Sequence, residues 1–167
     1  MHQDYIMRIV EQFVQALLAI MHRRKAGEYK ETREQVRIAA RYFLRMDLDL
    51  LLLYDHEYML AHFKDFAGRL ETDKCVLGAD LFYELAMIEE AEKQSECALR
   101  LKELCLYLYS IGLPKEVRFQ KTHYFEKVSS LIEALRNQPF SEQTRVSLRT
   151  YANFIESQSS REKNAHE

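Results

Sequence analysis

The densest group of acidic side chains in the sequence lies in AMIEEAEKQSECALRLKEL, residues 86–104. Four of its carboxylates, Glu89, Glu90, Glu92 and Glu96, fall within eight residues. Residues three or four positions apart share one face of a helix, so pairs of these carboxylates could serve as a general acid and base. Such catalysis would also need a burying pocket and a perturbed pKa, and carboxylates near a helix N-terminus are favoured by the helix dipole in any case. We therefore interpret the four glutamates as a solvated helix face.

A second candidate for chemistry is the segment HEYMLAH, residues 56–62, which is similar to the HExxH zinc motif. Leu60 stands where the second zinc ligand would have to lie, and His62 is displaced from His56 to another face of a helix. The sequence also lacks the Glu-x-x-His spacing of di-iron bundles. We therefore expect no metal site.

The three cysteines, Cys75, Cys97 and Cys105, have no CxxC spacing and no histidine beside them in sequence. We expect them to be buried and inert, and we predict no catalytic site and no cofactor. Their odd number argues against a disulfide framework and favours a reducing, cytoplasmic setting. The segment MHQDYIMRIVEQ carries charges that a signal peptide would not, and the run LDLLLLY is too short to span a bilayer, so we expect no membrane partner.

The sharpest pattern is a stripe of arginines. Arg33, Arg37, Arg41 and Arg45 recur every four residues, which places them on one face of a helix. Like charges at this spacing repel by roughly 0.2–0.5 kcal/mol per pair, so something must offset them. One interpretation is that acidic residues of the middle of the chain, such as Asp47, Asp49 or Asp55, neutralise the stripe within the fold. The other is that the stripe binds an acidic peptide, a nucleic acid or an acidic face of another copy of the chain.

Charge is unevenly distributed along the chain. The net charge is −2, made up of +4 over residues 1–46, −8 over residues 47–104 and +2 over residues 105–167. Such asymmetry indicates complementary contacts between parts of the chain or between copies of it. A homo-oligomer is therefore an alternative, and nucleic acid ranks third because the chain is acidic overall and has no recognised nucleic-acid-binding motif.

The elements that must position these residues are helices. The sequence has only four glycines and two prolines, and apolar residues recur at three- and four-residue steps, whereas strand alternation is absent. We predict an all-α chain of about six to seven helices, with one domain over residues 1–157 and a disordered polar tail over residues 158–167. The pattern leaves open whether residues 75–110 form one helix or two.

Two segments share a layout that resembles the tetratricopeptide repeat. AGEYKETREQVRIAARYFL and AMIEEAEKQSECALRLKEL each have a small residue, an aromatic or apolar residue, a glutamate and an alanine at equal offsets. The positions are Gly27, Tyr29, Glu31 and Ala39 in the first segment, and Ala86, Ile88, Glu90 and Ala98 in the second. The whole chain, beginning with DYIMRIVEQ, resembles a bacterial family of tetratricopeptide-like architecture. The copies lie farther apart than the 34 residues of a tandem array, so a segment is inserted between them.

The resemblance implies stacked antiparallel helix pairs that bind a protein or peptide in a groove. Some such proteins read a C-terminal carboxylate with lysine and asparagine, but the corresponding positions here are Leu77 and Leu81, so we do not expect that mode. We therefore expect a non-catalytic binding module or small adaptor. The alternatives are a structural homo-oligomer and a binder of acidic ligands through the arginine stripe.

Overall fold

The computed structural model describes residues 1–165, and all of its regular structure is helical. Eight α-helices occur in this part of the chain, more than the six to seven expected, because the leucine-rich insert forms two very short ones. They are α1 (His2–Lys25), α2 (Tyr29–Ala39), α3 (Leu48–Leu51), α4 (His56–Ala61), α5 (Thr72–Ala91), α6 (Ser95–Gly112), α7 (Thr122–Ala134) and α8 (Glu142–Ala165). A π-helix, η1 (Ala40–Leu44), extends α2, and two 3₁₀ turns, η2 (Leu113–Lys115) and η3 (Val117–Phe119), connect α6 to α7. The prediction of an all-α chain is confirmed.

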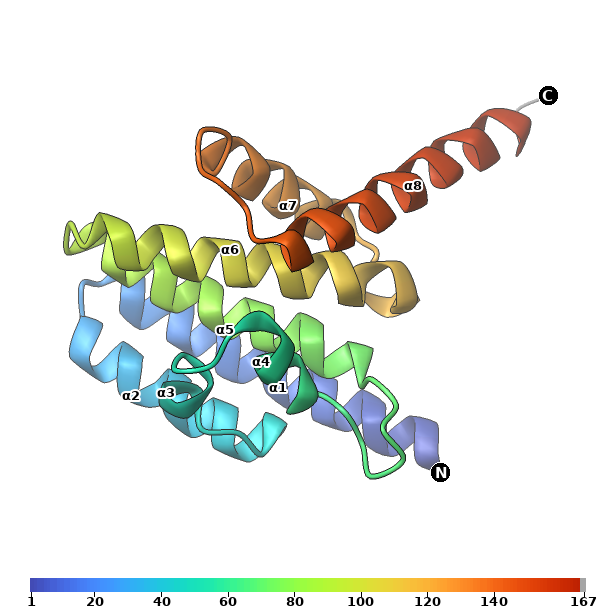
Figure 1. Cartoon of the computed structure of the whole chain (residues 1–167). Helices are drawn as coiled ribbons and strands as arrows, with labels where there is room; N and C mark the ends of the chain where they lie inside the picture. Colours follow the sequence, from blue (N-terminus) through green and yellow to red (C-terminus); the bar gives the residue numbers. More distant parts are fainter. Residues whose placement is uncertain (166–167) are drawn as a thin grey trace.

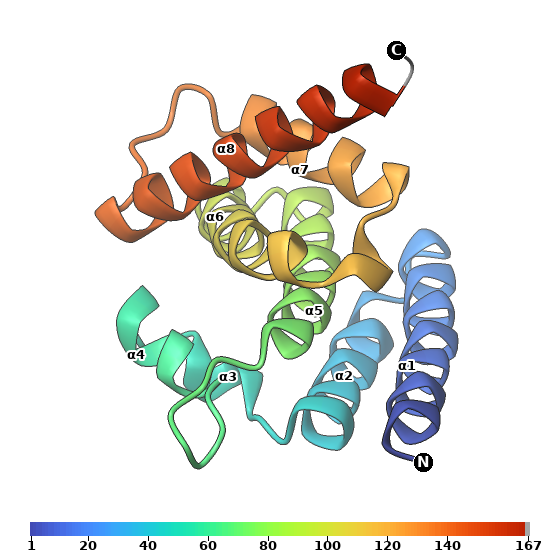
Figure 2. The same cartoon turned by 90° about the vertical axis from the view of Figure 1, so that its right-hand side faces the viewer.

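The helices stack in chain order (Figure 1). The α1–α2 pair packs on α5, and α5 packs along the length of α6, which in turn carries α7 and α8 on its other side. The short helices α3 and α4 lie beside this stack (Figure 2). No helix within residues 1–165 combines the length and the apolar character needed to cross a bilayer.

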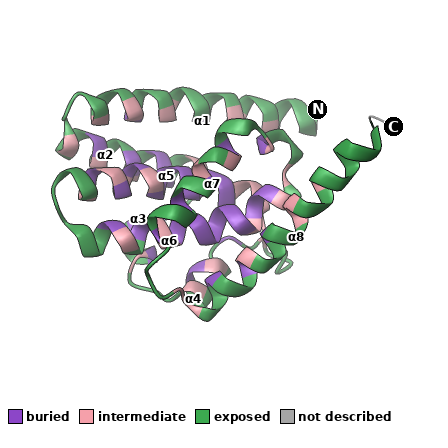
Figure 3. Cartoon of the chain, turned by 90° about the horizontal axis from the view of Figure 1, so that it is seen from above, coloured by how far each residue is buried: buried purple, intermediate pink, exposed green. Residues whose placement is uncertain are grey.

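The core is centred on α5 and α6, which are the most deeply buried helices, whereas α1 and the end of α8 are largely exposed (Figure 3). Fully buried side chains of this pair include Leu81, Phe82, Leu106 and Leu108. Each contributes about 1.5–3 kcal/mol by leaving water. Buried side chains lie on nearly every face of α5. The helix can therefore pack against the α1–α2 pair on one side and against α6 on the other.

Residues 75–110 form two helices, which answers the question that the pattern left open. The break lies at Lys93, whose φ of 60° is left-handed, and not at Ala86, where the repeat alignment would put it. The amide of Lys93 donates to the carbonyl of Glu90 and that of Gln94 donates to the carbonyl of Glu89, which is a Schellman turn. The repeat alignment thus misplaces the turn by about two helical turns, because an alanine inside a helix provides no reason to stop it.

The end of the chain also differs from the expectation. We predicted a disordered tail over residues 158–167, but α8 continues as a helix to Ala165. The segment contains neither glycine nor proline, so nothing in it breaks the helix. Residues 166–167 lie outside the described part of the chain.

Candidate functional site: a basic groove beside the first helix pair

The four arginines of the stripe lie in two different environments. Arg33 reaches across to α5, where its Nη2 lies 2.8 Å from Oε1 of Glu89 and 2.9 Å from Oε2 of Glu92. Its Nη1 also donates to Glu92, and these bonds raise the pKa of the guanidinium although its partial burial works in the opposite direction. Arg37 donates through Nε to Asp49 at 3.0 Å. The upstream half of the stripe is therefore neutralised within the fold.

The downstream half is not neutralised. Within residues 1–165 no carboxylate lies within ion-pairing distance of Arg41 or Arg45, and both side chains are exposed. Arg41 lies on the π-helix η1, and Arg45 follows it with a left-handed φ of 58°. Left-handed backbone costs a non-glycine residue roughly 1–2 kcal/mol, and π-helical turns often occur at functional sites. Arg41 and Arg45 therefore both project from backbone conformations that are uncommon in helical proteins.

Arg41 and Arg45 line a groove of about 860 Å³ between α1, η1 and the start of α5. The other side chains that line it are Tyr5, Arg8, Ile9, Gln12, Ile38, Tyr42, Phe43 and Lys74. None of these lining residues is acidic. Figure 2 shows how the site is assembled, since the beginning of α1 lies beside the end of α2. We call this site the basic groove.

The charges of the basic groove come from three elements. Arg8 on α1 is exposed and, like Arg41 and Arg45, has no carboxylate partner among residues 1–165. Lys74 on α5 is held by Glu71, with the Nζ and Oε2 atoms 2.8 Å apart. Three uncompensated arginines thus face one groove, beside the exposed rings of Tyr5 and Tyr42. The arrangement can bind an anion that also presents apolar or flat surface.

Sequence reasoning found Arg41 and Arg45 but missed Arg8, Tyr5 and Tyr42. A signal for Arg8 was present: it precedes Gly27 by about as many residues as Arg45 follows it. In a helix pair that turns back at Gly27, such residues must lie near one another. The contribution of Lys74 has no comparable signal, because it depends on where α5 packs.

The other candidate constellations fall into structural roles. Glu89 and Glu92 bind Arg33, and Glu90 pairs with Lys102, so three of the four glutamates connect helices. Glu96 is exposed. Among residues 1–165 no group of three histidine, cysteine or carboxylate side chains could hold a metal ion.

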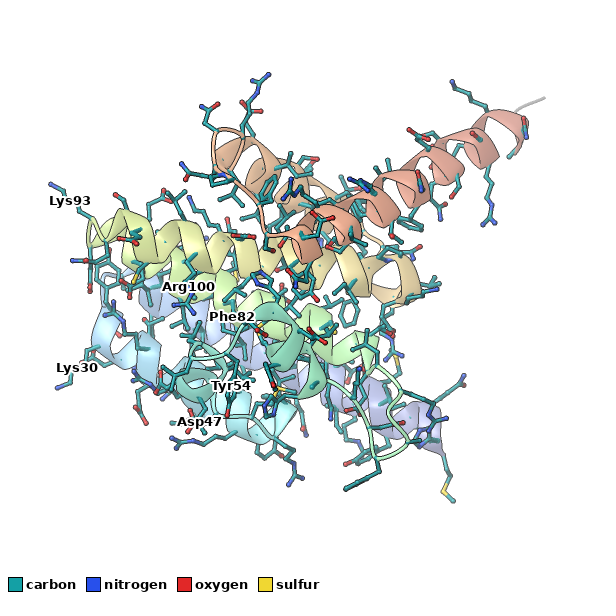
Figure 4. All side chains as sticks on the ribbon, in the orientation of Figure 1. Lys30, Asp47, Tyr54, Phe82, Lys93 and Arg100 are labelled. Atoms are coloured by element: carbon teal, nitrogen blue, oxygen red, sulfur yellow. The ribbon has the colours of Figure 1, made fainter. Side chains whose placement is uncertain are left out.

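The two histidines of HEYMLAH have separate neighbours. His56 lies against Thr144 and the ring of Tyr107, and its burial lowers its pKa. His62 instead stacks on Tyr54, whose position beside the short helices is labelled in Figure 4. The two imidazoles therefore form no common site.

The cysteines follow the expectation only in part. Cys75 and Cys105 are buried, and burial raises the pKa of each thiol. Cys97 is exposed, which corrects the expectation for that residue. It lies in the first turn of α6, where the sequence pattern gave no sign of its orientation.

A buried polar cluster joins α5, α6 and α7. Asp80 on α5 accepts hydrogen bonds from the hydroxyl of Tyr109 on α6 at 2.5 Å and from that of Tyr124 on α7 at 2.7 Å. Lys127 lies 3.7 Å from the same carboxylate and over the ring of Tyr83. Burial raises the pKa of Asp80, and the ammonium of Lys127 partly opposes this effect. Among residues 1–165 no buried side-chain polar atom lacks a hydrogen-bond partner, so the cluster is satisfied within the fold and we assign it a structural role.

Comparisons of the chain with protein-family models, with curated proteins and with solved structures returned no match.

Proposed function

We propose that this chain is a non-catalytic binding module of tetratricopeptide-like architecture that holds an acidic segment of a partner protein in the basic groove. The observation that carries the proposal is the convergence on one groove of Arg8, Arg41 and Arg45, none of which forms an ion pair with a carboxylate among residues 1–165. An anionic partner would remove their mutual repulsion and form charge-assisted hydrogen bonds with the guanidinium groups.

The architecture supports a repeat-like module. The α1–α2 and α5–α6 pairs both end their first helix in a Schellman turn, built on Gly27 in one case and on Lys93 in the other. Each pair packs against the next, as stacked helix pairs of solenoids do. Proteins built this way use the surfaces between helices to hold partners.

The experiment is affinity capture from the native host after nuclease treatment. We expect a protein that the wild type retains and that the double variant Arg41→Glu/Arg45→Glu loses. The matched control is Arg149→Glu/Arg161→Glu, which makes the same change in charge on exposed residues of α8. Titration of the purified partner should show binding at least about 10-fold weaker to the groove variant, a difference of about 1.4 kcal/mol, and weaker wild-type binding at higher salt.

Two outcomes would contradict the proposal. If the groove variant and the control retain the same proteins, with unchanged helicity by circular dichroism, the groove is not the binding site. If capture depends on the groove but is abolished by nuclease, the ligand is a nucleic acid. Arginines beside exposed tyrosines could hold one by charge and stacking.

A further inference from the structure

The basic groove does not end at its arginines. A second, smaller depression of about 140 Å³ lies farther along the same two helices and is floored by Ala16 and Ala19 of α1. It shares Ile38, Tyr42 and Phe43 with the basic groove, so the two depressions adjoin each other beside α1 and together make one extended groove. This groove has a cationic end near Arg8 and an apolar end at Ala19.

The dimensions of the groove select a ligand shape. At about 1.5 Å per residue, the stretch of α1 from Arg8 to Ala19 is about 16 Å long, which matches three turns of a helix. Small side chains such as Ala16 and Ala19 allow a second helix to approach closely, to an interaxial distance of about 8–10 Å. The exposed parts of Ile38 and Tyr42, at 46% and 66%, flank this floor and would be covered by the ligand.

The chemistry of the groove also disfavours an extended peptide. The groove is bounded by helices, whose backbone amides and carbonyls are already hydrogen-bonded within each helix, so it offers no edge for strand addition. Gln35 and the hydroxyl of Tyr42 are the polar groups among the side chains that line the apolar depression. An extended segment lying there would leave most of its backbone groups without partners, whereas a helix satisfies its own.

We infer that the ligand of the groove is an amphipathic helix of about three turns, with an acidic end at Arg8, Arg41 and Arg45 and an apolar stripe on Ala16 and Ala19. This inference rests on the proposed function and adds the form of the partner segment. Charge complementarity requires the acidic end of the ligand to lie at the three arginines. The alanine floor fixes where its apolar residues lie.

The test is selection from a displayed library of random 16-residue peptides on the wild-type protein, with counter-selection on Arg41→Glu/Arg45→Glu. We expect enriched peptides with apolar residues at i, i+3 or i+4 and i+7, with acidic residues gathered at one end, and with helical circular dichroism in the complex. Groove-dependent peptides that are extended or interrupted by proline would overturn the inference and leave the proposed function standing. A selection with no groove-dependent peptide would overturn both.

A second variant tests the apolar end by itself. Ala19→Trp places a large ring in the smaller depression on an exposed position and should weaken the selected peptides about 10-fold or more. Ala152→Trp, an equally exposed position on α8, is the control and should leave binding unchanged. If Ala19→Trp binds the selected peptides as tightly as the control does, the apolar depression is not part of the site and the inference fails.

Discussion

At the scale of single residues, the environment of a charge decides its role. Arg33 and Arg45 belong to the same stripe, yet Arg33 is bound by two glutamates of α5 and Arg45 faces a groove that has no acid among its lining residues. Ion pairs at protein surfaces contribute only about 0–1 kcal/mol, and the pairs of Arg33 are only partly buried. They are therefore better understood as fixing how α2 packs on α5 than as a large stabilising contribution.

The buried carboxylate of Asp80 allows a prediction on pH. Burial raises its pKa in the folded chain above the value of 3.8 for the free side chain, so between these two pKa values the folded state binds more protons than the unfolded state. Lowering the pH from 7.5 to 5 should therefore stabilise the wild type relative to Asp80→Asn. The measurement is the free energy of unfolding in urea at both pH values.

The control for this experiment concerns His123, whose imidazole also acts electrostatically on the carboxylate of Asp80. Both proteins should therefore carry His123→Gln. Tyr109 and Tyr124 also face Asp80, and burial raises the pKa of both hydroxyls, so they stay neutral in this experiment. The remaining group that faces Asp80 is Lys127. A stability difference that does not change between the two pH values would contradict a pKa of Asp80 raised into this range.

At the scale of elements, two turns with one geometry are built from different residues. Gly27 occupies the left-handed position after α1 at φ 80°, and Lys93 occupies the corresponding position after α5 at φ 60°. Glycine adopts this conformation without steric cost, whereas in lysine the Cβ atom comes too close to the backbone. The side chain of Lys93 points away from the rest of the molecule (Figure 4) and makes no hydrogen bond or ion pair within residues 1–165. The α5–α6 turn is therefore strained without a compensating contact.

This strain predicts that Lys93→Gly stabilises the protein. Relief of the left-handed strain should exceed the added entropy of the unfolded chain and give a net gain of about 0.5–1 kcal/mol in the free energy of unfolding. Urea denaturation at neutral pH measures it. The reciprocal variant Gly27→Lys should lose a similar amount, and a loss of stability in Lys93→Gly would mean that the turn is not strained.

At the scale of the whole molecule, much of the charge asymmetry is neutralised by ion pairs within the chain. The acidic middle block supplies Glu84 to Arg24, Glu89 and Glu92 to Arg33, and Asp49 to Arg37. These contacts join the α1–α2 pair to the rest of the stack. Fewer acidic residues are then left to attract the basic groove of another copy.

We therefore expect the purified chain to be a monomer at both low and high salt. Light scattering between about 50 and 500 mM salt checks this, because screening at the higher salt concentration would dissociate any charge-driven oligomer. An oligomer at low salt that dissociates at high salt, and that Arg41→Glu/Arg45→Glu prevents, would instead favour self-association through the groove. The control variant Arg149→Glu/Arg161→Glu should not change the result.

The sequence by itself determined the local features of this protein. Apolar steps of three and four residues predicted the helices, because such steps depend only on neighbours within a few residues. The expected shared face of the four arginines holds only for a regular helix, and the chain leaves the α-helix at Ala39, before Arg41 and Arg45. The turn at Lys93 escaped prediction, because lysine in a left-handed conformation has no sequence signature.

Only the tertiary structure decided which arginines are available to a ligand. Arg33 is neutralised because α5 brings Glu89 and Glu92, which are distant in sequence, against α2. Arg41 and Arg45 instead meet Arg8 and Tyr5, because α1 and α2 turn back on each other and place the two ends of the pair together. An ion pair depends on which helix packs against which, and that choice is made by the burial of apolar surface over the whole chain rather than by the spacing of the charges.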